Sequence, residues 1–158
     1  MQNSLAEQII ERIPQIATLY YRLALVVAPA GSGKTAALQE VATQTGTQVI
    51  NLSLELSKAL LDLTERQRPL RVSRILDQIA DTLGDQTLFF DHTELLFDPS
   101  LKLDPLRSLQ QLARRRTVVA AWNGSLDGNY LVYARPDHPE YRRYPTADLV
   151  MVVPRSAV

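Results

Sequence analysis

The chain has 158 residues, of which 46% are apolar and 22% are charged. This size and composition are typical of one globular domain. Disorder is expected only in the first few residues and in the tail 154–158. Seventeen basic residues balance seventeen acidic ones, so DNA contact has no support from net charge, although a local basic patch is compatible with this balance. The sequence has no cysteine, which excludes disulfides, thiol catalysis and cysteine-bound metal. Its N-terminus is charged and amphipathic, and no apolar run is long enough to cross a membrane, so we expect a cytoplasmic protein without membrane contact.

The first part of the chain predicts a helix, a buried strand and a second helix. Apolar residues recur at helical spacing within 1–22, which predicts an N-terminal helix. The run LALVVA at 23–28 has no polar face, as expected of a central parallel strand that is covered on both sides. The segment 34–46 is then expected to be a helix that ends at Gly46.

The rest of the chain continues this alternation. We expect strands at 48–52, 87–91, 117–123 and 148–153 and helices at 54–63, 72–84 and 104–116. A polar connection broken at Pro69 and a hairpin that turns at Asp127 and Gly128 are also expected. Strands that alternate with helices form a parallel sheet between helical layers. The sequence therefore predicts one α/β domain over 1–158 with the three-layer P-loop NTPase fold, a mostly parallel five-stranded sheet of the additional-strand (AAA+-like) type and no helical lid domain. Within this domain, residues 1–22 contain the N-terminal helix, residues 23–153 form the core and residues 154–158 form the tail.

The sequence APAGSGKT at 28–35 directly follows the first strand and opens the next helix. The pattern G-x-x-x-x-G-K-[ST] describes a phosphate-binding loop, and only its first position departs here, because Ala28 replaces a glycine and would resist a positive φ. Glycines let backbone N–H groups wrap a polyphosphate, Lys34 would bridge the outer phosphates, and the Thr35 hydroxyl would ligate Mg²⁺. The residues expected to bind ATP are Pro29, Ala30, Gly31, Ser32, Gly33, Lys34, Thr35 and Ala36. The alternative is a glycine-rich turn with an incidental Lys-Thr pair.

A second acidic element follows the strand at 87–91. An aspartate at the end of an apolar strand can hold Mg²⁺, so Asp91 and Thr35 are the predicted metal ligands, although Asp91 could instead cap the following turn. His92 stands where many additional-strand ATPases carry a glutamate, and we expect it to be structural or solvent-facing. The next carboxylate is Glu94, and this D-x-x-E spacing is similar to that of signal-transduction ATPases related to the AAA+ class. Glu94 is the candidate for activating water; otherwise it is a surface acid.

Three further polar residues complete the predicted catalytic set. Asn123 ends a buried strand, where additional-strand ATPases place a sensor of the γ-phosphate, although an Asn before Gly is also a plain turn former. Arg142 and Arg143 precede the last strand, from where the arginine finger of AAA+ proteins reaches the neighbouring subunit. A surface pair flanked by packed tyrosines is the alternative, and the sequence does not choose between the two arginines. The predicted catalytic residues are Lys34, Glu94, Asn123, Arg142 and Arg143.

Other arginines and aromatic residues have simpler interpretations. The arginines at 114–116 end a helix, where cations interact favourably with the helix dipole. The four arginines within 66–74 are expected to be solvated loop charge, with a phosphate, nucleic-acid or partner surface as the alternative. Tyr20 and Tyr21 are expected to pack in the core rather than to line an adenine pocket.

Four segments together resemble the BrxF family, the small P-loop proteins of type 3 BREX (bacteriophage exclusion) systems. They are APAGSGKT, INLSLELSKALLDL with RQRPLR, LLFDPSLKLDPLRSLQQLARRRTVVAAWNG, and HPEYRRYP, and the resemblance extends from Ile9 to Val153. It implies a role in phage defence beside a DNA methyltransferase, a helicase, a large ATPase and an alkaline-phosphatase-like protein. It also implies nucleotide-site roles for Gly33, Lys34, Thr35, Asp91, Glu94 and Asn123. Compared with full AAA+ proteins, the chain stops after the fifth strand, so the missing lid would come from self-association or from a BREX partner.

Three functions remain open from the sequence. The leading one is a Mg²⁺-dependent ATPase that couples its nucleotide state to assembly as a homo-oligomer or with BREX partners. The second is an ATP-binding scaffold or switch without significant hydrolysis, which the missing glutamate after Asp91 and the missing lid favour. The third is a small-molecule kinase whose arginines at 66–74 hold an acceptor phosphate, but no insertion is an obvious lid over two substrates.

Overall fold

A computed structural model of the chain describes residues 4–154. Its helices are α1 (Leu5–Ile16), α2 (Lys34–Thr45), α3 (Leu52–Leu60), α4 (Arg68–Ala80) and α5 (Pro105–Leu112), with short 3₁₀ helices η1 (Asp81–Leu83), η2 (Glu94–Phe97) and η3 (Pro99–Leu101). Its strands are β1 (Leu23–Ala28), β2 (Val49–Asn51), β3 (Leu88–Asp91), β4 (Val118–Asp127), β5 (Tyr130–Tyr133), β6 (Arg142–Pro145) and β7 (Val150–Val152). The disorder expected for the first residues and for 155–158 falls outside the described residues. No helix within 4–154 has the length and apolar character of a membrane span.

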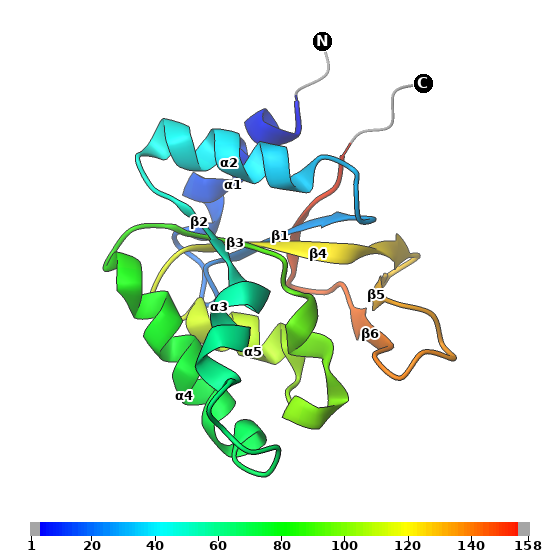
Figure 1. The fold of residues 1–158 in the computed structure, drawn as a ribbon. Coiled ribbons are helices and arrows are strands. Elements are labelled where there is room, and N and C mark those ends of the chain that lie inside the picture. Colours follow the sequence, from blue (N-terminus) through cyan, green and yellow to red (C-terminus); the bar gives the residue numbers. More distant parts are fainter. Residues whose placement is uncertain (1–3, 155–158) are drawn as a thin grey trace.

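Five parallel strands form the sheet, in the order β2-β3-β4-β1-β7. β4 therefore lies between β1 and β3, although it follows both in the sequence. Beyond its parallel part β4 continues into an antiparallel ladder with β5, and β6 pairs with β5 (Figure 1). The predicted parallel five-stranded sheet is confirmed, and the structure adds an antiparallel pair that extends it.

Helices cover both faces of the sheet, with α1 and α2 on one face and α3, α4 and α5 on the other (Figure 1). All six residues of β1 are buried, and their side chains alternate between the two layers. Leu25 and Val27 pack towards α3 to α5, whereas Ala24 and Val26 pack towards α1 and α2. Each larger apolar side chain contributes about 2 kcal/mol by burial, so the strand that precedes the glycine-rich loop is firmly anchored. The three-layer α/β architecture is confirmed.

The structure corrects two expectations about the segments between strands. Pro69 does not break a connection, because it stands in the first turn of α4, which begins at Arg68. A proline there loses no helical hydrogen bond and already has a helical φ. The strand β6 was not predicted, because its four residues RRYP combine two charges with a proline. Its side chains nevertheless alternate, with Arg142 and Tyr144 partly buried and Arg143 exposed.

The predicted hairpin is present, with its turn one residue later than expected. β4 and β5 pair as far as Asp127 and Tyr130, so the two turn residues are Gly128 and Asn129. Gly128 has a φ of 58°, and a positive φ is what the tight turns favoured in hairpins require. The hairpin continues β4 beyond its parallel neighbours, directly after the predicted sensor residue.

Candidate functional site

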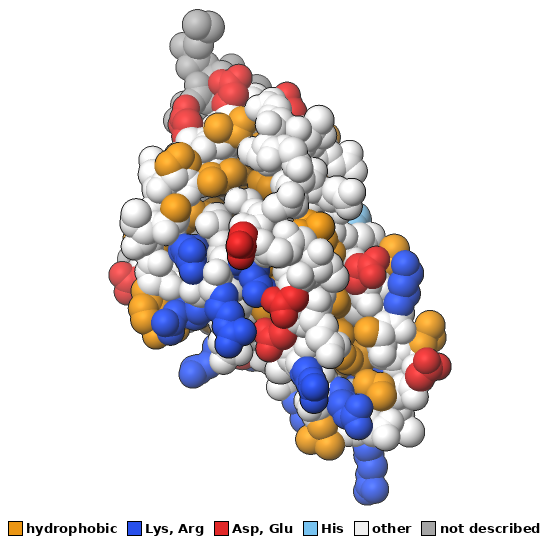
Figure 2. All heavy atoms as spheres, turned by 90° about the vertical axis from the view of Figure 1, so that its left-hand side faces the viewer, with side chains coloured by type: hydrophobic (Ala, Val, Ile, Leu, Met, Phe, Trp, Pro, Cys, Tyr) orange, Lys and Arg blue, Asp and Glu red, His pale blue; other side chains and the backbone are white. Residues whose placement is uncertain are grey.

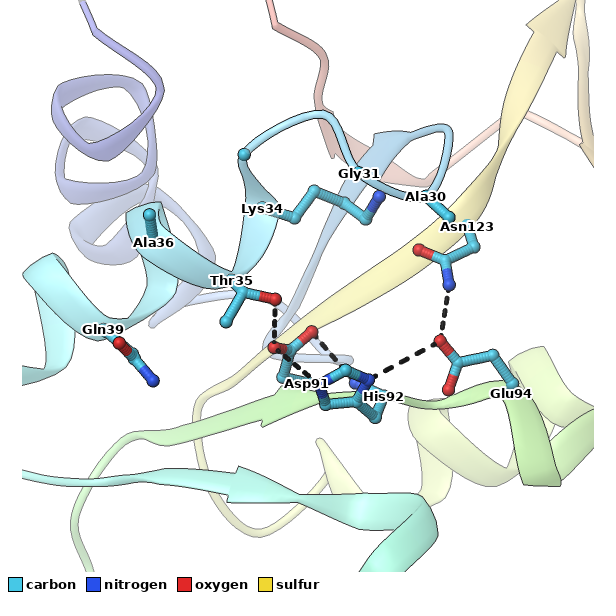
Figure 3. Close-up of a pocket in the computed structure, with 11 residues that line it drawn as sticks. Ala30, Gly31, Lys34, Thr35, Ala36, Gln39, Asp91, His92, Glu94 and Asn123 are labelled. Carbon is cyan, nitrogen blue, oxygen red and sulfur yellow. Dashed lines mark hydrogen bonds and ion pairs between the residues drawn. The ribbon is translucent and has the colours of Figure 1, made fainter.

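A cavity of about 510 Å³ lies at the carboxyl ends of β1, β3 and β4. Parallel strands end at one edge of a sheet, which is where ligands bind in α/β proteins of this kind. The loop after β1, the turn after β3 and the middle of β4 all contribute to the cavity wall (Figure 3). The lining residues are Ala30, Gly31, Gly33, Lys34, Thr35, Ala36, Gln39, Asp91, His92, Glu94 and Asn123.

The loop between β1 and α2 leaves open space above its backbone. Gly31 and Gly33 have φ values of +78° and +91°, and a Cβ at either position would meet no atom within 4 Å. Left-handed backbone geometry, rather than crowding, therefore explains these glycines. Ala28 is the last residue of β1 and is not among the described residues with positive φ, so the strain expected of an alanine at a positive φ does not arise. Of the eight predicted ATP-binding residues, only Pro29 and Ser32 do not line the cavity, and the Ser32 hydroxyl donates to the Pro29 carbonyl.

Lys34 is buried in the first turn of α2, with 4% of the residue exposed. Its Nζ donates to the carbonyl oxygens of Ala28 and Pro29, each at 2.7 Å. Burial lowers the pKa of Lys34, while the nearby carboxylates of Asp91 and Glu94 act in the opposite direction. Its Nζ donates only to neutral backbone carbonyls, which anionic phosphate oxygens could replace as stronger, charge-assisted acceptors.

Asp91 ends β3 and is 5% exposed. Its Oδ2 accepts a hydrogen bond from Thr35 Oγ1 at 2.6 Å, and its Oδ1 accepts one from the His92 N–H at 2.9 Å. The structure thus brings the two predicted Mg²⁺ ligands into contact. Hydroxyl and carboxylate oxygens are ligands that Mg²⁺ prefers, and this ion usually takes its remaining ligands from phosphates and water. Residues 4–154 contain no cluster of three or more His, Cys, Asp or Glu that could hold a metal ion.

Glu94 and Asn123 meet at the far side of the same cavity (Figure 3). Glu94 begins η2, and Asn123 lies in β4 opposite Ala28 at the end of the parallel ladder. Asn123 Nδ2 donates to Glu94 Oε1. The carboxylate predicted to activate water and the predicted sensor are therefore in direct contact.

Lys34 and Thr35 open helix α2, directly after the buried strand β1 and a glycine-rich loop. Asp91 lies opposite them at the end of β3. β4 is inserted between β1 and β3. The chain has a P-loop NTPase-like fold. The loop between β1 and α2 is called the P-loop below.

His92 lies between the two carboxylates and is half exposed. Its Nε2 is 3.5 Å from Asp91 Oδ2, and its Nδ1 is 4.0 Å from Glu94 Oε1. Its φ of 52° is left-handed, which is uncommon for a residue with a side chain and is found where the surrounding structure enforces it. His92 faces solvent as expected, and it also lines the cavity.

Ser53 was not predicted as a site residue, yet it holds the turn that carries His92 and Glu94. Its Oγ donates to the His92 carbonyl oxygen at 2.5 Å, accepts from the Leu95 N–H at 3.1 Å, and lies 3.5 Å from Glu94 Oε2. Its own N–H donates to the same His92 carbonyl at 2.8 Å. Ser53 belongs to the first turn of α3, about 40 positions earlier in the chain, so no local pattern could have identified it.

The predicted finger arginines lie on β6 and do not line the cavity. The Arg142 guanidinium donates to the Leu103 carbonyl oxygen at 2.9 Å. The Arg143 guanidinium stacks over the Tyr130 ring, 3.4 Å from its centroid. Both arginines thus have local partners, which agrees with the alternative of a surface pair beside tyrosines and leaves a role in a neighbouring copy untested.

Two other predictions are corrected. The arginines within 66–74 are mostly on helix α4 rather than in a loop. Tyr20 and Tyr21 are 66% and 39% exposed, so the expectation of core packing is wrong. They also do not line the P-loop cavity, because they belong to a separate cavity beside β7.

No protein-family model matches the sequence, and no curated protein matches it. Among solved structures, the chain is similar to C. elegans PCH-2, with 18% sequence identity and a TM-score of 0.42. The alignment covers 78% of this chain and 36% of that chain, so this chain spans little more than a third of the PCH-2 chain. A likeness at this level adds no argument about function, which is therefore inferred from the residues of the site.

Proposed function

We propose that this chain binds ATP with Mg²⁺ at the P-loop and hydrolyses it slowly, and that its nucleotide state controls its assembly. The observation that supports this most is the 2.6 Å contact between Thr35 Oγ1 and Asp91 Oδ2. These residues lie 56 positions apart in the sequence, and both line the cavity that also contains Lys34. Shared Mg²⁺ binding requires these two oxygens to lie close together, whereas a simple glycine-rich turn does not.

Phosphate binding would use the backbone and one cation. The N–H groups of the P-loop and the N-terminal end of the α2 dipole favour an anion. Lys34 would exchange its carbonyl partners for phosphate oxygens. Mg²⁺, held by Thr35 and Asp91, would supply positive charge next to the same phosphates.

Hydrolysis would depend on Glu94. Its carboxylate would orient a water molecule towards the γ-phosphorus, and the bond to the bridging oxygen of ADP breaks as the new P–O bond forms. Asn123 would sense the γ-phosphate by hydrogen bonding, and it would have to share its amide with the Glu94 carboxylate that it already contacts. Among the described residues, no arginine lines the cavity, so charge that develops in the transition state is only partly neutralised. We therefore expect slow turnover by one copy alone.

A second copy could supply the missing cation. Arg142 and Arg143 are the candidates, and Arg143 is the more exposed of the two. Either guanidinium would first have to leave its present partner, Leu103 or Tyr130. Arginine added in trans would raise turnover steeply with protein concentration.

The resemblance to the BrxF family extends this proposal to phage defence. On that basis the assembly partners would be further copies of this chain or BREX proteins, namely the methyltransferase, the helicase, the large ATPase or the alkaline-phosphatase-like protein. Co-purification of tagged chain with each of these, with and without ATP, tests this extension. Recovery that does not depend on the nucleotide would contradict it.

A nucleotide-binding scaffold without significant hydrolysis is the second candidate. Two observations favour this function. The Glu94 carboxylate already accepts a hydrogen bond from Asn123, and no arginine among the described residues lines the cavity. A small-molecule kinase has no comparable support, because the arginines within 66–74 do not line the cavity.

The substitution Glu94→Gln separates hydrolysis from binding. We expect it to lower phosphate release about 100-fold, because the amide cannot accept a proton from water, while the affinity for a fluorescent ATP analogue with Mg²⁺ is kept. Phosphate release is followed at several protein concentrations, and Glu55→Gln, at an exposed glutamate of α3, is the matched control. If wild-type protein binds ATP but releases no phosphate, the scaffold is the correct function. If it binds no ATP, both proposals fail.

The substitution Ser53→Ala tests whether the turn that carries Glu94 must be held in place. Losing the hydroxyl removes one of the two donors to the His92 carbonyl and leaves the Leu95 N–H without its partner. A displaced catalytic group is expected to slow phosphate release about 10- to 100-fold. Affinity for ATP should stay unchanged, since Ser53 does not line the P-loop cavity. Ser57→Ala, one turn further along α3 and exposed, serves as the control. Equal release rates for both variants would show that the turn holds its shape without Ser53.

A further inference from the structure

The amino-terminal edge of the sheet, opposite the P-loop, carries a separate surface of arginine and tyrosine. The segment before β1 and the segment before β4 run side by side here, because the Arg22 N–H donates to the Ala113 carbonyl and the Val118 N–H donates to the Arg22 carbonyl. Lysine and arginine side chains gather on this side of the molecule next to hydrophobic ones (Figure 2). We call Tyr20, Tyr21, Arg22, Arg114 and Arg115 together the Arg–Tyr surface.

The Tyr20 ring is exposed and yet held in place. Arg114 stacks its guanidinium 3.7 Å from the centroid of the Tyr20 ring and also donates to the phenol oxygen. Tyr21 packs its ring edge-to-face against Tyr20, with centroids 4.8 Å apart. These contacts limit the rotamer freedom of the aromatic pair, so little side-chain entropy remains to be lost when a ligand stacks on it.

The positive charge of this surface is not neutralised within the chain. The Arg22 guanidinium donates to the carbonyl oxygen of Arg114 at 2.8 Å, and Arg114 donates to a phenol, so both partners are uncharged. Among the described residues, Arg22, Arg114 and Arg115 form no ion pair. Arg116 differs, because it pairs with Asp81 at 2.6 Å. These three arginines therefore concentrate positive charge locally on a chain of zero net charge.

A cavity of about 510 Å³ lies beside the aromatic pair, between the segment before β1 and the start of β7. Its walls are largely apolar, and among the described residues that line it the only charged group is the carboxylate of Asp148. A phosphate would avoid this carboxylate, whereas a ring N–H or an amino group of a nucleobase could donate to it. The lining residues are Leu19, Tyr20, Tyr21, Asp148, Leu149 and Val150.

We propose that the Arg–Tyr surface binds single-stranded nucleic acid, with bases against Tyr20, Tyr21 and the adjoining cavity and with phosphates at the arginines. Exposed aromatic rings beside uncompensated cations are the combination that binds unpaired bases and their backbone. A duplex would not fit, because its base faces are already stacked and are not available to tyrosine. This binding goes beyond the nucleotide chemistry of the P-loop and uses the opposite edge of the sheet.

Fluorescence anisotropy with a labelled oligothymidylate of about 12 nucleotides tests the proposal. We expect binding that weakens with salt, with a slope of log affinity against log salt of about −2 for three phosphate contacts. Tyr20→Ala should weaken binding at least about tenfold through lost stacking, and Tyr20→Phe should retain it. Arg114→Lys keeps the charge but loses the planar stack, so it should also weaken binding. Arg71→Ala, at an exposed arginine of α4 away from this surface, is the matched control, and an oligouridylate arm distinguishes RNA from DNA.

Three results would overturn the proposal. The first is that wild-type protein does not bind the oligonucleotide at low salt. The second is that the Tyr20→Ala variant binds it as tightly as wild type with an unchanged melting temperature, and the third is that a duplex is bound as tightly as the single strand. If Tyr20→Ala instead dissociates an oligomer in a sizing experiment without changing oligonucleotide affinity, the surface is an interface between copies of this chain. Lys34→Ala protein should still bind the oligonucleotide, so failure of the ATP proposal would be seen separately.

Discussion

Replacing Lys34 with alanine is expected to lower the affinity for ATP at least about 30-fold, because truncating one partner of a buried, hydrogen-bonded charge pair costs about 2 to 5 kcal/mol. Lys34 lines the cavity and only 4% of the residue is exposed, so water compensates poorly for the loss of its ammonium group. Phosphate release should fall to background in the same protein. Binding is measured by titration with a fluorescent ATP analogue in the presence of Mg²⁺.

Lys58→Ala is the matched control for this change. Lys58 is an exposed lysine of α3 that pairs with Glu55 at 3.6 Å, so its removal should leave ATP affinity unchanged. A melting curve of Lys34→Ala protein is required, since Lys34 Nζ also binds the carbonyls of Ala28 and Pro29. Folded Lys34→Ala protein with normal ATP affinity would remove the P-loop from the proposed function.

Replacing Gly124 with alanine is expected to destabilise the protein by about 3 kcal/mol, at the upper end of the usual cost of overpacking. A Cβ at this position would lie 2.0 Å from the Val132 carbonyl oxygen and 2.9 Å from Trp122 Nε1. The carbonyl belongs to the paired strand β5 and accepts a hydrogen bond from Trp122 Nε1 at 3.2 Å. The hairpin therefore has to move away from β4, and the indole loses its partner. Thermal unfolding should show a melting temperature lower by about 6 to 12 °C for a domain of this size.

The chain offers a spectroscopic readout and a control for this second prediction. Trp122 is its single tryptophan, so a displaced hairpin should change the intrinsic fluorescence of the folded protein. Gly128→Asn is the matched control, because a Cβ there meets no atom within 4 Å and Asn tolerates the φ of +58°. Equal stability of the Gly124→Ala and Gly128→Asn variants would mean that β4 and β5 can separate without cost.

These two changes affect different elements, because Lys34 opens α2 and Gly124 lies in β4. Gly124 directly follows Asn123, which contacts Glu94 in the cavity. We therefore expect Gly124→Ala to lower the melting temperature and also to slow phosphate release, whereas Lys34→Ala is expected to act mainly by weakening ATP binding. A comparison of melting temperature with ATP affinity in the two variants separates damage to the fold from damage to the site.

Much of the site could be predicted because its signals are local. The P-loop motif places Lys34 and Thr35 within eight consecutive residues, and an apolar run ending in Asp91 indicates a buried strand with a carboxylate at its end. The structure brings Asp91 into contact with Thr35, as that pattern implied. The roles assigned to these residues in ATP binding and hydrolysis stay predictions.

The contribution of Ser53 could not be predicted. This serine acts on a turn about 40 positions away, and nothing in its immediate sequence differs from an ordinary start of a helix. The exposure of Tyr20 and Tyr21 was likewise missed. Aromatic side chains before a buried strand usually pack inside, and only the position of the Arg114 guanidinium over the Tyr20 ring shows that this pair is held at the surface.

The amino-acid sequence by itself determined the alternation of strands and helices, the geometry of the P-loop and the carboxylate at the end of β3. These depend on hydrophobic periodicity and on backbone preferences that act over a few residues. Only the tertiary structure decided that Asn123 meets Glu94 and that arginines and tyrosines gather at the opposite edge of the sheet. Those relationships arise when the two faces of the sheet are buried against their helices, and that packing joins residues whose separation in the chain carries no local signal.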